Sequence, residues 1–181
     1  MRAYLSYVMV VIVCGGLFGQ ELTQMTQDSL VRENEIKVNG LILIFGAFEV
    51  NYERFLNEES SVGVSLLIPF VDSDDVNWNI NYYISPYYRV FFGKAYASGF
   101  FVEGFGMLNS KERERYSGNE FLGIEDVTDF GLGLGLGAKW VTSKGFVFEL
   151  NGGLSRNLFN NKDYSGGEVT GKIGFNVGYR F

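Results

Sequence analysis

The feature that most constrains this chain of 181 residues is a strict alternation of apolar with polar or glycine residues, clearest at its C-terminal end. The apolar residues there occupy every odd position: Ile173, Phe175, Val177, Tyr179 and Phe181. Lysine, glycine, asparagine and arginine occupy the even positions from 172 to 180. Successive side chains of a β-strand point to opposite faces, so this period of two predicts a strand with one apolar and one polar face.

The same alternation predicts further strands along the chain. They are expected over 47–55, 61–70, 80–92, 99–108, 130–140 and 146–155. A strand over 36–45, turning back at Gly46, brings the number to eight. Single-chain barrels of the bacterial outer membrane have even strand numbers, which agrees with this total.

The expected connections alternate in length. Short turns are expected at 57–60, 93–98 and 142–145, and long polar loops at 71–79, 109–127 and 160–168. This asymmetry is typical of outer-membrane barrels, whose periplasmic turns are short and whose extracellular loops are long. The sequence therefore predicts an all-β fold, an eight-stranded antiparallel transmembrane β-barrel in up-and-down order, over residues 36–181.

The residue types on the two faces decide which face points inward. The apolar faces carry large side chains, whereas the opposite faces carry glycine, serine, asparagine and isolated charges. The interior of an eight-stranded barrel is narrow and is filled by side chains, which suits the second set. The charges expected inside are balanced in sign: Glu49, Glu53, Glu103 and Glu149 against Arg89, Lys139, Lys172 and Arg180.

Balance is what a desolvated interior requires, because an unpaired buried charge is costly. The alternative is a soluble barrel with its apolar face inward around a ligand, in which these eight charges would be solvated. The large lipid-compatible faces favour the membrane orientation.

The N-terminal residues have the layout of a secretory signal peptide, expected over 1–19. Arg2 precedes an uncharged, mostly apolar run of 16 residues from 3 to 18. A spanning helix needs about 20 apolar residues, so an anchor helix is the less favoured alternative. Cys14 lies inside this run and is interpreted as an apolar leader residue rather than a lipid attachment site. Residues 20–35 are expected to form a periplasmic N-terminal extension.

Composition excludes several classes of function. The chain has no histidine, which removes Ser-His-Asp and Cys-His catalysis and the usual zinc sites. A net charge of -6 argues against nucleic-acid binding, and a single cysteine excludes a disulfide scaffold. We therefore expect no catalytic residues, no metal, no cofactor and no nucleic-acid partner.

An acidic cluster, Asp72, Asp74 and Asp75, lies in one of the expected long loops. Paired carboxylates can perform acid–base catalysis, and carboxylate oxygens bind calcium. The cluster has no patterned partner and lacks the spacing of a calcium loop. A solvated polar loop is the favoured interpretation.

Residues 111–115 alternate in the sign of their charge, reading Lys-Glu-Arg-Glu-Arg. The pattern suits a β-extension above the membrane or a loop held by ion pairs. Its cations could also bind lipopolysaccharide phosphates or a protein partner. The simplest interpretation is a solvated extracellular loop.

The C-terminal segment resembles the targeting signal that the barrel-assembly machinery recognises in bacterial outer-membrane barrels. That signal has a terminal Phe, an aromatic residue two positions earlier and apolar residues at alternate positions, matched here by Phe181, Tyr179, Val177, Phe175 and Ile173. Residues 36–181 resemble the small eight-stranded barrels typified by the OmpA membrane domain and OmpX. The stretches Lys37-Val-Asn-Gly-Leu41 and Tyr52-Glu-Arg54 are similar to those of an uncharacterised group of small outer-membrane proteins.

This resemblance implies the outer membrane of a Gram-negative bacterium as the location. It implies outer-membrane lipid and lipopolysaccharide, and the barrel-assembly machinery, as partners, and it assigns no activity. Barrel enzymes of the outer membrane use a histidine, which this chain lacks.

The expected function is a non-enzymatic barrel that stabilises the envelope or presents its extracellular loops to a protein partner or for adhesion. The alternative is a small pore or an accessory subunit of an outer-membrane transport or secretion complex. A soluble exported lipid binder is a third hypothesis.

Overall fold

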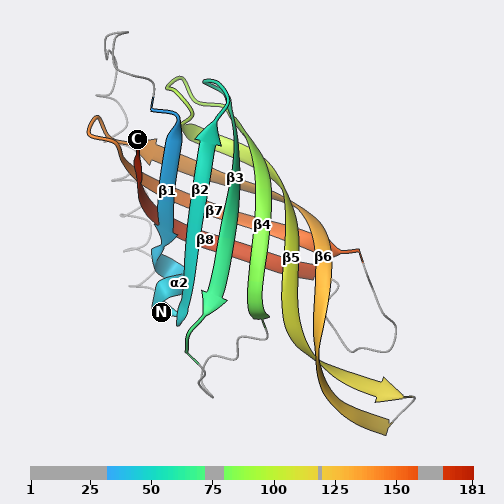
Figure 1. The fold of residues 1–181 in the computed structure, drawn as a ribbon. Helices are drawn as coiled ribbons and strands as arrows, with labels where there is room; N and C mark the ends of the chain where they lie inside the picture. The colour runs from blue at the N-terminus through green and yellow to red at the C-terminus, as the bar shows by residue number, and fades with distance from the viewer. Residues whose placement is uncertain (1–31, 72–79, 118–119, 159–168) are drawn as a thin grey trace, which may run out of the picture. The chain divides into compact units, whose positions relative to one another are not determined.

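A computed structural model describes residues 32–71, 80–117, 120–158 and 169–181. Eight antiparallel strands form one closed barrel in sequence order (Figure 1). The strands are β1 Asn34–Asn39, β2 Ala47–Phe55, β3 Ser60–Pro69, β4 Ile80–Phe91, β5 Gly99–Ser117, β6 Glu120–Val141, β7 Phe146–Asn157 and β8 Val169–Arg180. The predicted fold class, an all-β up-and-down barrel of eight strands, is confirmed. No helix within the described ranges has the length and apolarity to cross a membrane.

The barrel closes between its first and last strands. The register runs from Glu35 opposite Arg180 to Asn39 opposite Asn176. Asn34 and Phe181 exchange two backbone hydrogen bonds of 3.0 and 2.8 Å at the end of this ladder. Closure therefore leaves no open strand edge along the length of β1.

The expectation of a strand over 36–45 is wrong for its second half. Strand β1 starts at Asn34 and ends at Asn39, and residues 40–44 form the short helix α2 Gly40–Ile44. The Asn39 side chain caps this helix by accepting a hydrogen bond of 3.3 Å from the Ile42 backbone N–H. Asparagine is among the best helix N-cap residues, which explains the local switch from strand to helix.

Asn39 also replaces the missing part of β1 along β8. Its Oδ1 accepts a hydrogen bond from the Phe175 backbone N–H at 3.2 Å, and its Nδ2 donates to the Ile173 carbonyl at 3.1 Å. One side chain therefore satisfies two backbone groups of β8 that a longer β1 would have paired.

The expectation of a loop over 109–127 is also wrong. Strands β5 and β6 stay paired as far as Ser117 opposite Glu120, whereas β4 pairs with β5 only to Lys111. The outer part of this hairpin is a two-stranded ribbon that extends past the other strands (Figure 1). A β-extension, one of the alternatives for residues 111–115, is the conformation observed.

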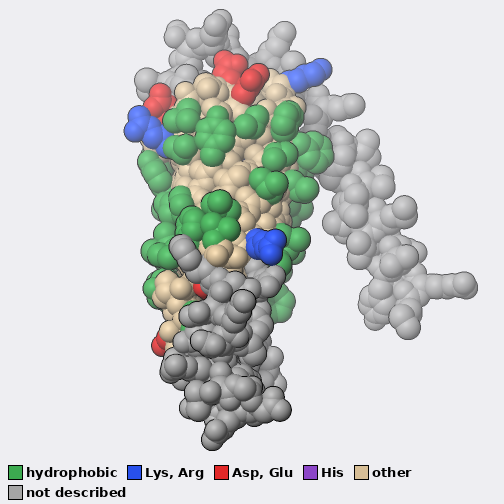
Figure 2. Space-filling view, turned by 90° about the vertical axis from the view of Figure 1, so that its right-hand side faces the viewer, with side chains coloured by type: hydrophobic (Ala, Val, Ile, Leu, Met, Phe, Trp, Pro, Cys, Tyr) green, Lys and Arg blue, Asp and Glu red, His purple; other side chains and the backbone are tan. Residues whose placement is uncertain are grey.

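The two faces of the wall differ as the alternation predicts. Inward residues of β1–β8 are mainly polar and buried, and the outward residues include most of the large hydrophobic side chains that stay exposed. Figure 2 shows these hydrophobic side chains spread over one side of the barrel wall, with charged side chains at its upper rim.

Inward-facing glycines of β6 make room for aromatic rings. A Cβ atom on Gly137 would collide with the Phe101 ring and the Leu150 carbonyl oxygen, and one on Gly133 would collide with the Phe105 ring. Both rings come from the neighbouring strand β5 and fill the barrel interior. The glycine run of β6 is therefore a packing requirement of the core.

The interior is layered along the barrel. Phe55, Phe91, Ala97 and Phe101 form an apolar cluster towards the end at which β8 terminates. A second apolar cluster lies towards the opposite end and consists of Ile42, Ala47, Leu67, Tyr83, Tyr87, Phe105 and Met107. Charged side chains lie between the two clusters.

Candidate functional site

The charged layer inside the barrel is the candidate site. Seven of the eight charges expected inside are at most 6% exposed: Glu49, Glu53, Arg89, Glu103, Lys139, Glu149 and Arg180. The eighth, Lys172, has a side chain that is 5% exposed. The structure therefore places all eight side chains in the barrel interior.

Two further buried charges, Glu35 and Lys37, belong to the same layer and were missed from the sequence. From the sequence, Glu35 is expected in the N-terminal extension over 20–35. The signal that could have found both is the alternation of β1, in which Ile36 and Val38 point outward between Glu35, Lys37 and Asn39. With these two residues the layer contains five acidic and five basic side chains.

Glu53 lies at the centre of the layer. Its carboxylate is 2.5 Å from Lys37 Nζ, 2.8 Å from Lys139 Nζ and 2.9 Å from Arg89 Nη1. The Ser61 hydroxyl donates a hydrogen bond of 2.6 Å to its other oxygen. Three cations therefore share one carboxylate, in addition to the neutral donor.

Glu149, contributed by β7, binds the same three cations from another side of the barrel. Its Oε2 atom is 2.6 Å from Lys37 Nζ, 2.8 Å from Arg89 Nη1 and 3.5 Å from Lys139 Nζ. Its Oε1 accepts hydrogen bonds from the amides of Asn151 and Asn176. Strands that lie far apart in the sequence are therefore connected through the barrel interior.

The network continues towards both ends of the barrel. At one end Glu35 binds Lys37 and Lys139 at 2.9 Å each and Arg180 at 3.0 Å. At the other, Arg89 Nε lies 2.8 Å from Glu103, which also binds Lys172. An unbroken chain of ion pairs therefore links Arg180 to Lys172.

Aromatic rings complete the surroundings of the cations. The Arg89 guanidinium carbon lies 4.3 Å from the centroids of both the Tyr87 and the Phe101 rings. Its Nη2 has no hydrogen-bond acceptor among the described residues, and the two ring faces supply cation–π contacts instead. Lys172 and Arg180 lie similarly over Phe105 and Phe55, at 4.2 and 4.1 Å.

Glu49 is the exception within the layer. Its carboxylate accepts a hydrogen bond of 2.6 Å from Asn39 Nδ2, and no ion pair joins it to a base in the described part of the chain. Glu49 therefore supports the side chain that ends β1 rather than the central network.

Three of the carboxylates could in principle hold a metal ion, because oxygens of Glu35, Glu53 and Glu149 lie within 4.8 Å of one another. The Lys37 ammonium group lies among them, at 2.9, 2.5 and 2.6 Å from the three carboxylates. A protein cation already occupies the position that a metal would take. The arrangement is a closed electrostatic network of carboxylates and protein cations.

The short turn between β4 and β5 closes one end of the barrel. Arg180 donates hydrogen bonds of 3.0 and 2.9 Å to the carbonyls of Tyr96 and Ala97 in this turn. Ala97 is fully buried and has a positive φ of 41°. The last charge of the network therefore also anchors the turn.

The residues of the C-terminal signal lie on the outward face of β8, where Ile173, Phe175, Val177 and Tyr179 are exposed together with the terminal Phe181. The rings of Tyr179 and Phe146 pack edge to face at 5.8 Å. Other expectations lie outside the described residues: the leader over 1–19, and Asp72, Asp74 and Asp75. The side chains at 112–115 are not described either.

The chain matches no known family model, no curated protein and no solved structure.

Proposed function

We propose that this protein is an integral barrel of a Gram-negative outer membrane with a structural, envelope-stabilising or loop-mediated binding role and no catalytic activity. One observation carries the proposal: the charges are inside the barrel and the large apolar side chains are outside. In water this arrangement would expose an apolar surface around the whole wall, which soluble monomers rarely do. In a bilayer the same surface meets hydrocarbon.

The interior supports this proposal over a soluble lipid binder. A soluble binder would need an apolar cavity inside, whereas the centre here holds five acidic and five basic side chains, all of them but Glu49 joined by ion pairs. Because the polar face of the strands points inward, only the apolar face would be left to contact water in a soluble protein. A lipid environment removes this conflict.

The absence of catalysis is supported by the state of the carboxylates. Glu53 and Glu149 each contact three cations, which leaves neither carboxylate available as a base. The sequence also contains no histidine. The network is suited to holding strands together, a structural role.

The β5–β6 ribbon supports a binding role outside the membrane. Among the described residues, the ladder between β4 and β5 ends at Lys111, and that between β6 and β7 ends at Gly131, followed by one hydrogen bond from Leu158 to Phe130. The outer part of the ribbon therefore presents two backbone edges to a protein partner. In this proposal residues 1–19 direct export and are removed. The outward apolar residues of β8 are then recognised by the barrel-assembly machinery.

Membrane fractionation tests the proposal directly. The full chain, expressed with its own leader in a Gram-negative host, should remain in the outer-membrane fraction after carbonate washing. It should also migrate differently on a denaturing gel before and after boiling, because a closed barrel resists detergent when unheated. Release by carbonate, together with no heat-dependent shift, would contradict an integral barrel.

The alternative, a small pore, is opposed by the filled interior. Ion pairs and aromatic rings occupy the centre, and the turn held by Arg180 lies at one end. Planar-bilayer recording of the refolded protein distinguishes the two functions. We expect no sustained current, and steady, sizeable conductance would favour the pore.

A further inference from the structure

The outer wall of the barrel is uneven in a way that depends on which strands form it. The outward positions of β2, β3 and β4 contain no glycine, and side chains such as Leu66 and Ile84 are only 37% and 39% exposed because they flank one another. Over β5 to β8 glycines stand at outward positions, and Leu134 and Leu154 are 72% and 67% exposed. This second wall is therefore hollowed between projecting leucines.

The hollow is formed by two rows of residues that run across the strands. Gly104 of β5 lies opposite Leu134 of β6, which lies opposite Leu154 of β7, and Leu154 lies opposite Gly171 of β8. A Cβ placed on Gly104 would meet no atom within 4 Å. Leu134 and Leu154 therefore project at the centre of the row, and the space beside them at Gly104 is open.

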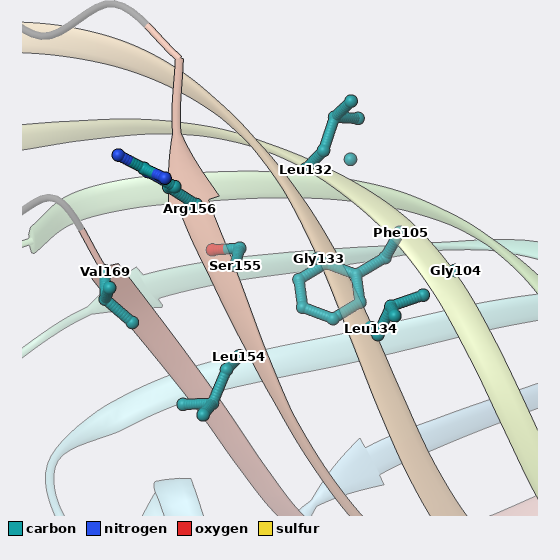
Figure 3. A pocket seen from close by; sticks show the side chains of 10 residues that line it. Gly104, Phe105, Leu132, Gly133, Leu134, Leu154, Ser155, Arg156 and Val169 are labelled. Carbon is teal, nitrogen blue, oxygen red and sulfur yellow. The ribbon is translucent and has the colours of Figure 1, made fainter.

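Among the described residues of the lining, the second row carries the only basic side chain. It consists of Gly106, Leu132, Arg156 and Val169, in register across the same four strands. Arg156 is exposed and lies with Val169 near the ends of β7 and β8 (Figure 3). The hollow, whose lining also includes Phe105, Gly133 and Ser155 but not Gly171, has a volume of about 800 Å³.

Position and charge together identify an occupant. The short turns of an outer-membrane barrel lie in the periplasm. Strand β8 ends beside the short turn at 142–145, where the Arg180 N–H donates to the Gly145 carbonyl, so Arg156 and Val169 lie towards the cell exterior. A ligand of this hollow needs an apolar chain for the leucines and glycines, and an anionic group for the arginine at its outer end. Arginine pairs well with phosphate through its fork of N–H donors. A guanidinium has five N–H donors, so phosphate can be added to the interactions that Arg156 already makes.

We propose that the hollow over β5 to β8 binds one lipopolysaccharide molecule, with an acyl chain lying over Gly104 and a lipid A phosphate paired with Arg156. Lipopolysaccharide is chosen over phospholipid because the outer leaflet is the one that Arg156 faces. This proposal rests on the proposed function, since it requires an outer-membrane barrel oriented with β8 ending in the periplasm.

Native mass spectrometry of the refolded full chain in detergent tests this site with purified lipid A as the probe. Wild type should retain one lipid A, and Arg156→Gln should weaken binding about tenfold, the scale of one charge-assisted hydrogen bond. Gly104→Leu should weaken binding to a similar degree by filling the hollow. Arg54→Gln, which removes an exposed arginine from the opposite wall, is the matched control and should bind like wild type.

Lipid A lacking its phosphates should bind wild type as weakly as intact lipid A binds Arg156→Gln. Equal binding of lipid A by wild type, Arg156→Gln and Gly104→Leu would overturn the site. Phosphatidylglycerol binding as tightly as lipid A, with the same sensitivity to Arg156→Gln, would overturn the assignment to lipopolysaccharide. Each variant is first shown to be folded by its heat-dependent gel shift. If the protein shows the heat-dependent gel shift and resists carbonate, but the variants bind lipid A like wild type, only this inference is contradicted. If it shows no gel shift and is released by carbonate, the proposed function is contradicted.

Discussion

The inner and outer faces of the same eight strands satisfy opposite requirements. Inside, Glu53 and Glu149 are buried, and each contacts the same three cations. Outside, Leu132, Leu134 and Leu136 follow one another along the outward face of β6, where all three are exposed. The comparison teaches that the interior charges are neutralised by other side chains of the protein. The outer apolar side chains, in contrast, stay uncovered and need an apolar environment.

Removing one central carboxylate should produce the largest effect. Glu53→Gln leaves three cations with one carboxylate fewer, and breaking a buried ion pair costs about 3 to 5 kcal/mol. Urea unfolding in detergent micelles measures this loss of stability. The matched change Glu58→Gln, at an exposed turn position, should alter stability by less than about 0.5 kcal/mol. Equal effects of the two changes would show that the inner network contributes little.

A charge placed on the outer face should come next in size. Leu134→Arg is expected to destabilise the barrel in lipid vesicles by about 2 to 4 kcal/mol, because the outward charge would lie in hydrocarbon. Leu134→Ala, which adds no charge, should cost less. The free energy of unfolding in vesicles is the measurement. An unchanged or increased stability of Leu134→Arg would mean that this face meets water.

The same substitution on the two faces sharpens the comparison further. Gly137→Ala should destabilise the fold by about 1 to 3 kcal/mol, because the added Cβ collides with Phe101 and the Leu150 carbonyl. Gly104→Ala should be nearly neutral, since its Cβ enters open space. Denaturant titration of both variants under one set of conditions gives the difference. A larger loss for Gly104→Ala would reverse the assignment of inner and outer faces.

The smallest effect is expected for an exposed ion pair. Arg54 and Glu33 are 3.7 Å apart, with side chains 63% and 53% exposed. Arg54→Gln should change stability by less than about 1 kcal/mol, and this difference should shrink at high salt because exposed pairs are screened. The Glu53→Gln loss should persist at high salt. A salt-sensitive Glu53→Gln effect would indicate that water reaches the network.

Much of the fold followed from local sequence patterns. The alternation at 47–55 predicted β2 with the same first and last residues as in the structure, and the turn residues at 57–60 and 142–145 separated the neighbouring strands. Charges on the polar positions of the strands, such as Arg89 and Glu149, could be assigned to the interior for the same reason. Each of these inferences uses only neighbours along one strand.

The failures have physical causes that the two-residue period of a strand does not show. Residues 40–44 are apolar enough for a strand, but Asn39 caps a helix there and satisfies β8 instead. The polar residues after 108 read as a loop, yet β5 and β6 pair through them as a ribbon. Glu35 lies one position before the predicted start of the first strand, and its ion pair with Arg180, 145 residues away, forms only when the barrel closes.

The sequence by itself determined that this chain forms strands with one apolar and one polar face, because the two-residue period of a strand is a local property of the backbone. The tertiary structure alone decided which charges meet. Closure of β1 onto β8 brings Glu35 to Arg180, and the register of the wall brings Glu53, Arg89 and Glu149 together at its centre. It also decided where glycines and leucines align into a hollow, because that alignment depends on the stagger between strands and not on the order of residues within any one of them.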